Sequence, residues 1–310
     1  MVNAKERVRR NGVVPTVWNP RYSTDAAHTN STRKQAEVVR LALGAGLLDL
    51  QSVPFRRDEV VAEIEDIHAP SYVKAVLSGT PRSVAESQGF TWSPAFAKAV
   101  LRIWAGHVGA CQLAMKMGLV FHPVSGAHHA RHATGAGFCT FNFLSGAARV
   151  LLRDGLRRIA VVDLDAHQGD GTYDLEASNP GVALFDIAGQ AWTLAENNDR
   201  IQFHVVPDAE AYREALMRLP AFLDRVKPDL VQYQAGMDPY QGDYVGGIQD
   251  VGPAFLKWRD AFVIEEVRSR GIPLVVNLAG GYVDRVTVRL HLETVRTMAG
   301  QLAHEEKEAM

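Results

Sequence analysis

Three side chains that can bind a metal ion follow an apolar run near the middle of the chain. Asp163, Asp165 and His167 are spaced two residues apart, directly after residues 159–162. This run is β-branched and does not alternate with polar residues, which is typical of a strand buried on both faces. Ligands of open α/β sheets bind beyond the carboxyl ends of strands, and residues two apart in an extended chain share a face. Since carboxylates and imidazoles suit zinc, the pattern predicts a metal site; a polar turn that caps the next helix is the alternative.

Other reactive side chains also come shortly after apolar runs. They are Asp238, Tyr282 and the neighbours His128 and His129. Taken singly, each is more often a turn residue, a helix cap or an exposed loop side chain. All of them fall at the same edge of a parallel sheet, however, so we expect them to lie together.

These residue types together suit the hydrolysis of an amide. Asp165, His167 and Asp238 would leave one position on a zinc ion open for water and a substrate carbonyl. A neutral histidine can take the proton from that water, and a second histidine can handle the leaving amine. Asp163 and Asp170 are placed to orient the two histidines, and the tyrosine hydroxyl can donate to the oxyanion. No covalent intermediate is needed.

Strand-like and helical patterns alternate along the chain. Strands are predicted at residues 119–121, 159–164, 182–187, 201–206, 230–234 and 274–278. Helices are predicted at residues 32–48, 67–77, 94–117, 143–152, 209–225, 253–270 and 287–304. Pro220 interrupts the pattern at 209–225, and residues 305–308 are expected to be a fraying end. This alternation predicts an α/β fold with three layers, α/β/α, around a mostly parallel sheet, and one domain over residues 1–310.

Composition excludes several classes of protein. Hydrophobic residues make up 47% and charged residues 22% of the 310 residues, as in ordinary globular proteins. The net charge of -2 disfavours binding to nucleic acid, and no apolar stretch approaches the roughly 18 residues of a membrane span. Cys111 and Cys139 cannot form a disulfide framework. The first ten residues lack an apolar core, so we expect no secretory signal and a cytoplasmic protein.

In their order along the chain, these motifs resemble the superfamily of histone deacetylases and acetylpolyamine amidohydrolases, which are zinc-dependent and have an arginase-like α/β fold. The resemblance runs from about Ile67 to Tyr282 and is strongest between His128 and Ile187. The motifs that carry it are residues 126–130, 137–142, 163–171, 235–238 with Asp243, and 280–282.

The resemblance implies a role for each matching position. Asp165, His167 and Asp238 would bind one zinc ion per chain, although iron(II) also suits such ligands. His128 would pair with Asp163, His129 with Asp170, and Tyr282 would polarise the scissile carbonyl. The substrate-binding positions would be Gly137 and Phe138 on one tunnel wall, Gly280 and Gly281, and Trp192 on the opposite wall.

The resemblance also implies a structural potassium ion beside the zinc. Its shell would contain the Asp163 side chain, Asp186, and the main-chain carbonyls of Asp165, His167 and Ile187. Related proteins commonly have Ser-x-His where this chain has residues 186–188, so Asp186 adds a charge to that shell. A second monovalent ion would lie near the carbonyls of residues 176, 179 and 182.

Several alternatives remain open. The substrate is either an acylated lysine of a peptide or protein, or a small acylated amine such as an acetylpolyamine, for which Glu86 is a weak candidate cation-binding residue. A catalytically silent acyl-lysine-binding module is an alternative of another class. An arginase-like site with two metal ions is disfavoured because Gly169 stands where a bridging carboxylate would be needed.

Overall fold

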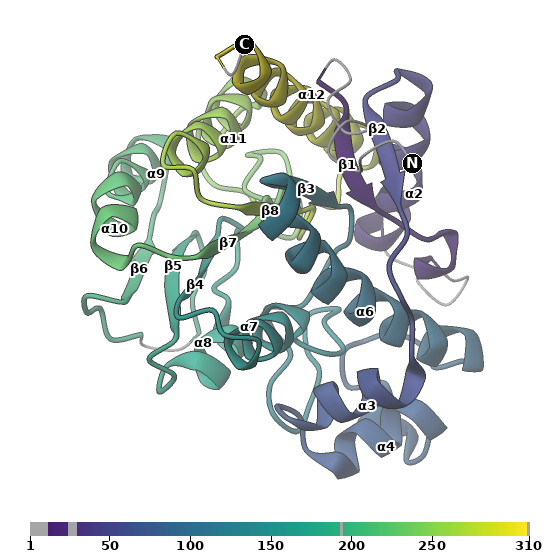
Figure 1. Cartoon of the computed structure of the whole chain (residues 1–310). Coiled ribbons are helices and arrows are strands. Elements are labelled where there is room, and N and C mark those ends of the chain that lie inside the picture. The colour runs from purple at the N-terminus through teal and green to yellow at the C-terminus, as the bar shows by residue number, and fades with distance from the viewer. Residues whose placement is uncertain (1–11, 24–29, 193–194, 309–310) are drawn as a thin grey trace.

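Parallel strands form one sheet through the centre of the molecule (Figure 1). The computed structural model describes residues 12–23, 30–192 and 195–308; the first ten residues, where no secretory signal is predicted, lie outside this part. Within it the sheet has eight strands in the order β2-β1-β3-β8-β7-β4-β5-β6, and every neighbouring pair is parallel. The strands are β1 (Val14–Val17), β2 (Leu48–Gln51), β3 (Leu119–His122), β4 (Ile159–Asp163), β5 (Val182–Ala188), β6 (Ile201–Val205), β7 (Leu230–Gln234) and β8 (Leu274–Asn277).

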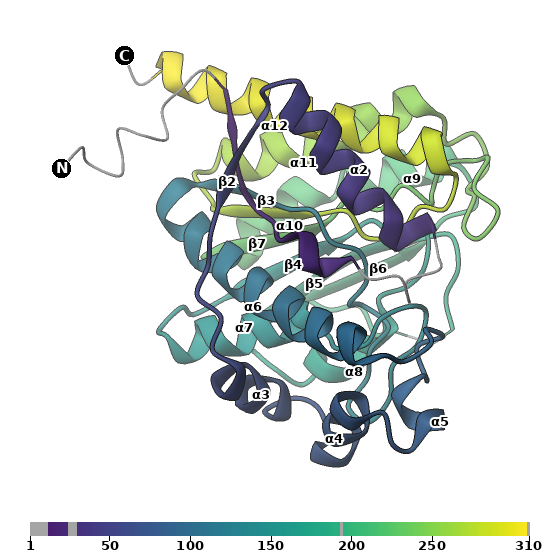
Figure 2. The ribbon, with the colours of Figure 1, turned by 90° about the vertical axis from the view of Figure 1, so that its right-hand side faces the viewer.

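Helices cover both faces of the sheet, as Figure 2 shows. One layer contains α2 (Asn30–Gly44), α9 (Ala209–Leu216), α10 (Leu219–Val226), α11 (Pro253–Arg268) and α12 (Asp284–Glu308). The other contains α3 (Arg57–Glu65), α4 (Pro70–Ser78), α6 (Pro94–Met117), α7 (Phe143–Arg153) and α8 (Asp170–Glu176), with the short helices η1 (Pro20–Tyr22) and α5 (Arg82–Ala85) on the same side. The protein therefore has the predicted three-layer α/β/α fold.

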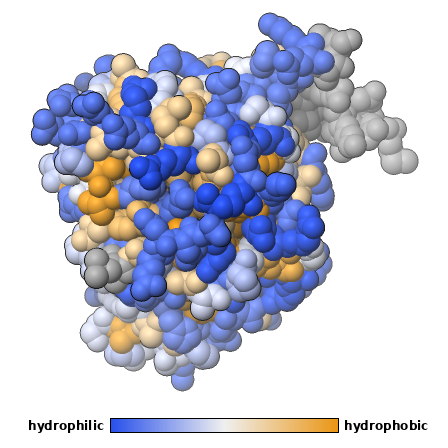
Figure 3. All heavy atoms as spheres, turned by 90° about the vertical axis from the view of Figure 1, so that its left-hand side faces the viewer, coloured by the Kyte–Doolittle hydropathy of each residue, from blue (hydrophilic) through white to orange (hydrophobic). Residues whose placement is uncertain are grey.

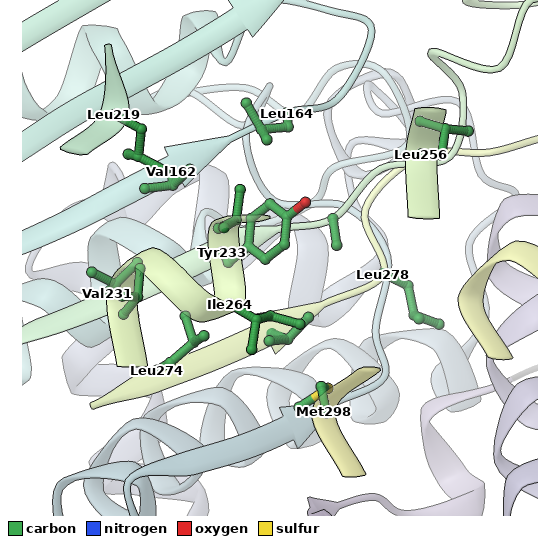
Figure 4. Packing of buried hydrophobic residues seen from close by; sticks show 14 of the residues in the cluster. Val162, Leu164, Leu219, Val231, Tyr233, Leu256, Ile264, Leu274, Leu278 and Met298 are labelled. Atoms are coloured by element: carbon green, nitrogen blue, oxygen red, sulfur yellow. The ribbon is translucent and has the colours of Figure 1, made fainter. Parts of the chain in front are cut away.

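Each face of the sheet has its own hydrophobic core. Along β4 and β7, Val162, Val231 and Tyr233 point to the cluster beneath α10, α11 and α12 (Figure 4), whereas Val161 and Leu230 point to the cluster beneath α6 and α7. Burial on both faces explains why these strands are continuously apolar. The side of the molecule drawn in Figure 3 is mostly hydrophilic, with scattered apolar side chains. In the described part of the chain, no helix is both long and apolar enough to cross a membrane.

Most predicted elements are present, and two have the predicted limits, α6 and β7. The pattern at 209–225 is interrupted at Pro220 as predicted, because this residue lies in the first turn of the separate helix α10. The strands β1 and β2 and the helices η1, α3, α5 and α8 were not predicted. The helix expected over residues 32–48 ends at Gly44, and Leu48 begins β2 instead. β1 contains a proline and β2 has only two apolar residues, so neither forms the apolar run that marks the equally short β3 and β8.

The expectation of a fraying end at residues 305–308 is wrong. Helix α12 continues to Glu308. Glu305 accepts hydrogen bonds of 2.9 and 2.8 Å from Arg268 of α11, which ties this last turn to the neighbouring helix. A charged run at the end of a sequence does not reveal such a partner.

Candidate active site

Five adjacent strands place a polar residue at the same level near their carboxyl ends. The strand register pairs His122 with Asn277, Asn277 with Gln234, Gln234 with Asp163, and Asp163 with Asp186. Residues paired in this way point to the same face of a parallel sheet, and here that face is the one beneath α6 and α7. The loops that follow this polar row carry the predicted site residues.

Asp165, His167 and Asp238 bring three possible ligand atoms within 4.8 Å of one another, all of them buried. The Nδ1 atom of His167 lies 3.0 Å from Oδ1 of Asp165 and 3.1 Å from Oδ2 of Asp238. The main-chain N–H groups of Ala166 and Gly280 donate to Asp238 Oδ1 (3.0 Å) and Asp165 Oδ2 (2.7 Å) and fix both carboxylates. One nitrogen and two carboxylates converging on one point fit a divalent ion such as zinc.

Two glycines keep this space open. A Cβ atom on Gly280 would collide with carboxylate oxygens of Asp165 and Asp238. A Cβ atom on Gly137 would collide with the ring of His129, and the φ angle of Gly137 is 49°, which favours glycine. Both positions were predicted to bind substrate, and the structure places both against the reactive side chains.

Each of the two adjacent histidines is hydrogen-bonded to an aspartate through Nδ1. Asp163 Oδ2 lies 2.9 Å from His128 Nδ1, and Asp170 Oδ1 lies 2.6 Å from His129 Nδ1. Because an ionised carboxylate only accepts, both Nδ1 atoms carry a proton. The Nε2 atom of His128 lies 3.8 Å from Asp165 Oδ1, at the edge of the ligand cluster. The two ring centroids are 4.0 Å apart.

The two histidines differ in their electrostatic surroundings. Burial disfavours the cationic form of His128, but the charges of Asp163 and Asp165 outweigh burial and raise its pKa to about 10. Burial and the charge on His128 together lower the pKa of His129. The aspartate paired with His129 also accepts a 2.6 Å hydrogen bond from Arg131, so its charge is shared. The surroundings therefore favour the cationic form of His128 and the neutral form of His129.

Tyr282 lies on a tightly held segment after β8. Asp243 Oδ2 accepts a 2.7 Å hydrogen bond from the main-chain N–H of Tyr282. The buried Lys34 donates to the carbonyls of Ala279 and Gly280, at 2.6 Å each. Burial and the nearby carboxylates raise the pKa of the Tyr282 phenol above its ordinary value, so the hydroxyl keeps its proton and can donate a hydrogen bond.

The aromatic candidates for the tunnel walls, Phe138 and Trp192, lie against reactive side chains of the site. The ring centroid of Phe138 is 6.2 Å from that of Tyr282. Trp192 is stacked on His167, with centroids 5.7 Å apart and planes inclined by 7°, and meets His129 edge-on at 5.6 Å. Trp192 is 59% exposed, so one face of its indole is open to a ligand.

A small, largely apolar cavity of about 60 Å³ adjoins the site. Phe138 and Cys139 line both this cavity and the space around His128 and Tyr282. Its remaining walls are largely aromatic and aliphatic side chains of α6 and the loops before α7. The arrangement leaves room for a short apolar group beyond the reactive centre.

Asp186 has the surroundings of a cation ligand. Its Oδ2 accepts a 2.8 Å hydrogen bond from the N–H of Gly169, while its buried Oδ1 has no partner among the described residues. Burial and the charge of Asp163 raise the pKa of the Asp186 carboxyl well above its usual range. A cation between the two carboxylates would satisfy the unpaired oxygen, so the residues fit the predicted potassium site. Ile187 is fully buried next to it.

The position predicted for a second monovalent ion is taken by a side chain. Arg200 donates to the carbonyls of Val182 (2.6 Å), Glu176 (3.3 Å) and Ala177 (2.5 Å). The side chain of Asn179 instead donates to the Glu176 carboxylate, at 2.6 Å. The guanidinium thus hydrogen-bonds to two of the three carbonyls that the resemblance assigned to the ion, and we place no second cation there.

Sequence reasoning missed three cations that hold the site together, Lys34, Arg131 and Arg259. Lys34 and Arg259 lie within predicted helices, where a charged residue is usually solvated, yet both are buried. Only the tertiary structure reveals that they face main-chain carbonyls.

Comparison with known proteins agrees with this geometry. The family described as the histone deacetylase domain matches residues 28–298. An uncharacterized protein of Picosynechococcus sp. is 31% identical over 281 residues, covering 88% of this chain and 93% of that protein. Histone deacetylase 2 of Arabidopsis thaliana is 26% identical over 292 residues, covering 88% and 74%. The crystal structure of an acetylpolyamine aminohydrolase from Burkholderia pseudomallei has the same fold, with a TM-score of 0.73 at 16% identity over 92% of this chain and 98% of that one. The chain therefore belongs to the histone deacetylase family and is a deacetylase, a hydrolase of amides.

Proposed function

We propose that this deacetylase uses one zinc ion per chain to remove acyl groups, acetyl above all, from lysine side chains. The observation that carries the proposal is the convergence of Asp165, His167 and Asp238 beside two oriented histidines and Tyr282. Zinc bound there would polarise the scissile carbonyl and lower the pKa of the attacking water. Iron(II) suits the same ligands and is the alternative metal.

Each of the three reactive side chains then has its own role in the reaction. His129, neutral at pH 7 and oriented by Asp170, takes a proton from the attacking water and passes it to the leaving amine. His128 stays cationic because Asp163 holds its Nδ1 proton, and it stabilises negative charge beside the reacting carbon. Tyr282 donates to the carbonyl oxygen as that oxygen becomes an oxyanion. No group of the protein forms a covalent bond to the substrate.

An acyl-lysine peptide suits the described rim better than an acetylpolyamine does. The candidate carboxylate for a polyamine, Glu86, already accepts a 2.8 Å hydrogen bond from the N–H of Trp92 and lies 3.5 Å from Arg82. Trp192 and Phe138 instead offer aromatic surfaces to an aliphatic chain. Gly137 and Gly280 lie against the reactive side chains, whereas a Cβ atom on Gly281 would meet Thr287, Met237 and Lys34. The small-amine substrate remains the second candidate.

We further propose that a potassium ion binds beside the zinc. Its ligands would be the carboxylates of Asp163 and Asp186 and the carbonyls of Asp165, His167 and Ile187. The buried, unpaired Oδ1 of Asp186 supports this assignment. Because two carboxylates face the ion, we expect it to bind tightly.

The whole chain would act as one catalytic domain, residues 1–310, in the cytoplasm. Its two cysteines are both free and buried, as a reducing compartment allows. The net charge of -2 supports a substrate other than nucleic acid, and we propose neither nucleic-acid nor membrane partners.

The test is a substrate and metal panel. Metal-depleted protein is reconstituted with zinc, or with iron(II) under anaerobic conditions, and assayed on acyl-lysine peptides and acetylpolyamines. We expect zinc to restore activity on acetyl-lysine peptides and a linear aliphatic hydroxamate to inhibit in competition with the peptide. Higher kcat/KM on acetylpolyamines would replace the substrate proposal, and insensitivity to hydroxamates would overturn the zinc site.

A further inference from the structure

A charged pair lies in the core beneath the site, although charges are seldom fully buried. Arg259 and Asp260 of α11 are 0% and 1% exposed, and Arg259 Nη2 lies 2.7 Å from Asp260 Oδ1. Asp260 also accepts hydrogen bonds from Tyr233 (2.6 Å) and Thr294 (2.5 Å). Tyr233 lies among the aliphatic side chains of this core (Figure 4). The pair thus has the additional hydrogen bonds that a buried ion pair needs.

The remaining guanidinium donors reach the two strand ends that carry the metal ligands. Arg259 Nη1 donates to the carbonyl of Gly236 at 2.7 Å and to that of Leu164 at 3.1 Å. Leu164 directly precedes Asp165, and Gly236 comes two residues before Asp238. One nitrogen therefore bridges the segments that follow β4 and β7 and lead to the ligand cluster.

We infer that Arg259 is a positioning residue for the metal centre, which fixes the separation between the Asp165 and Asp238 carboxylates. The inference rests on the proposed zinc function. Arg259 contacts neither ligand side chain, so it acts only through the backbone on which they stand. Groups that orient metal ligands typically change metal affinity or activity by about 10–100-fold when removed. Asp260 holds the guanidinium and keeps the buried charge balanced.

The same helix offers a matched control at the opposite edge of the sheet. Arg268 Nη1 donates to the carbonyls of Gly118 (3.0 Å) and Ile272 (2.8 Å), just before β3 and β8 begin. Its other nitrogens pair with Glu305 at 2.9 and 2.8 Å. Arg268 therefore bridges two strands from the same helix, with an acidic partner, but far from the ligands along the strands.

The experiment compares Arg259→Met/Asp260→Asn with Arg268→Met/Glu305→Gln; each double variant removes both charges of its pair. Zinc affinity is measured by competition with a chromophoric chelator, ligand geometry from the absorption spectrum of the cobalt(II) protein, and stability from Tm. We expect both variants to melt earlier. Only the Arg259 variant should bind zinc about 10–100-fold more weakly and show an altered cobalt spectrum, whereas the Arg268 variant should match the wild type in both.

A milder variant covers the case in which the double variant does not fold. Arg259→Lys keeps the charge but has only one nitrogen, which cannot reach Asp260 and both carbonyls in the same geometry. We expect it to lower zinc affinity by a smaller factor and to restore most of the cobalt spectrum. Wild-type affinity and spectrum in a folded Arg259 variant would overturn the inference alone. Failure of the wild-type protein to bind zinc would overturn both the inference and the proposed function.

Discussion

The two histidine–aspartate pairs of the site have the same hydrogen-bonding geometry in different surroundings. His128 pairs with Asp163 and also faces Asp165, so it has two negative neighbours. His129 pairs with Asp170, whose charge Arg131 shares, and the cationic His128 lies next to it. The carboxylates raise the pKa of His128, while burial and the neighbouring cation lower that of His129.

The comparison shows how two histidine–aspartate pairs of the same geometry can favour different protonation states of their imidazoles. Two titratable groups in unlike environments have separated pKa values, and the separation assigns the acid and base roles. Here the surroundings of each pair decide: the additional carboxylate of Asp165 raises the pKa of His128, whereas burial and the charge on His128 lower that of His129. Changing these surroundings should therefore alter catalysis in different ways.

The largest effect is expected when the aspartates themselves are changed. Asp170→Asn should reduce kcat/KM on an acetyl-lysine peptide by on the order of 10³-fold or more, because an amide can hold the neutral imidazole of His129 in the tautomer that cannot act as a base. Asp163→Asn should cost less, about 10–100-fold, since it removes the charge that keeps His128 cationic but leaves the base in place. Equal losses in the two variants, measured at saturating zinc, would remove the distinction between the pairs.

The substitution Tyr282→Phe is also expected to lower kcat strongly, although it leaves both histidine–aspartate pairs intact. Loss of one oxyanion donor costs about 10²–10³-fold in kcat, while the ring that packs beside Phe138 is retained. The pH profile, zinc content and Tm should remain those of the wild type. Wild-type turnover would remove Tyr282 from the mechanism, and a displaced pH profile would mean that it tunes a histidine.

A small effect on rate, but a defined one on pH dependence, is expected for Arg131→Gln. Without the guanidinium, the full charge of Asp170 acts on His129 and raises its pKa. Because the base must be neutral, the acidic limb of the kcat/KM profile should move to higher pH, with only a few-fold loss above it. If the acidic limb of the profile does not move, a group other than His129 determines its position. Arg153→Gln is the control, since Arg153 pairs with Asp66 at the surface.

The smallest effect on catalysis is expected from two buried histidines outside the site. Their titration should change the stability of the protein and not the acidic limb of the kcat/KM profile. Burial lowers the pKa values of His68 and His107 to about 4 each. Both are neutral in the folded protein and take up protons on unfolding, so stability falls as pH drops from about 6.5 toward 4. The loss reaches on the order of 3 kcal/mol per group. Denaturant unfolding at pH 7.5, 6 and 5 checks this; a constant free energy of unfolding would contradict it.

The sequence predicts the parts of this molecule that depend on local patterns. The long helix α6 and the buried strands β4, β7 and β8 have clear apolar runs, and parallel strands bring their following residues to one edge. The fold class and the grouping of Asp165, His167 and Asp238 follow from that rule. The strands β1 and β2 were missed because β1 contains a proline and β2 alternates apolar with polar residues, so neither forms an apolar run.

What the sequence could not predict are contacts between distant segments. Lys34 and Arg259 are separated along the chain from the carbonyls that they hold, and helical charges usually face water. Arg200 could not be recognised as the group bound to the carbonyls near Val182, because no local pattern links them. Trp192 could be named as a wall residue only through resemblance, whereas its stacking on His167 is visible only in three dimensions.

A zinc titration of metal-depleted protein, followed by hydrolysis of an acetyl-lysine peptide, tests most directly whether one zinc ion per chain is required for activity. Asp165, His167 and Asp238 are the one group of three clustered ligands among the described residues. Activity should therefore rise linearly and stop at one equivalent of zinc per chain, and Asp238→Ala should neither retain zinc nor gain activity. Full activity without metal, or a requirement for a second equivalent, would contradict the account.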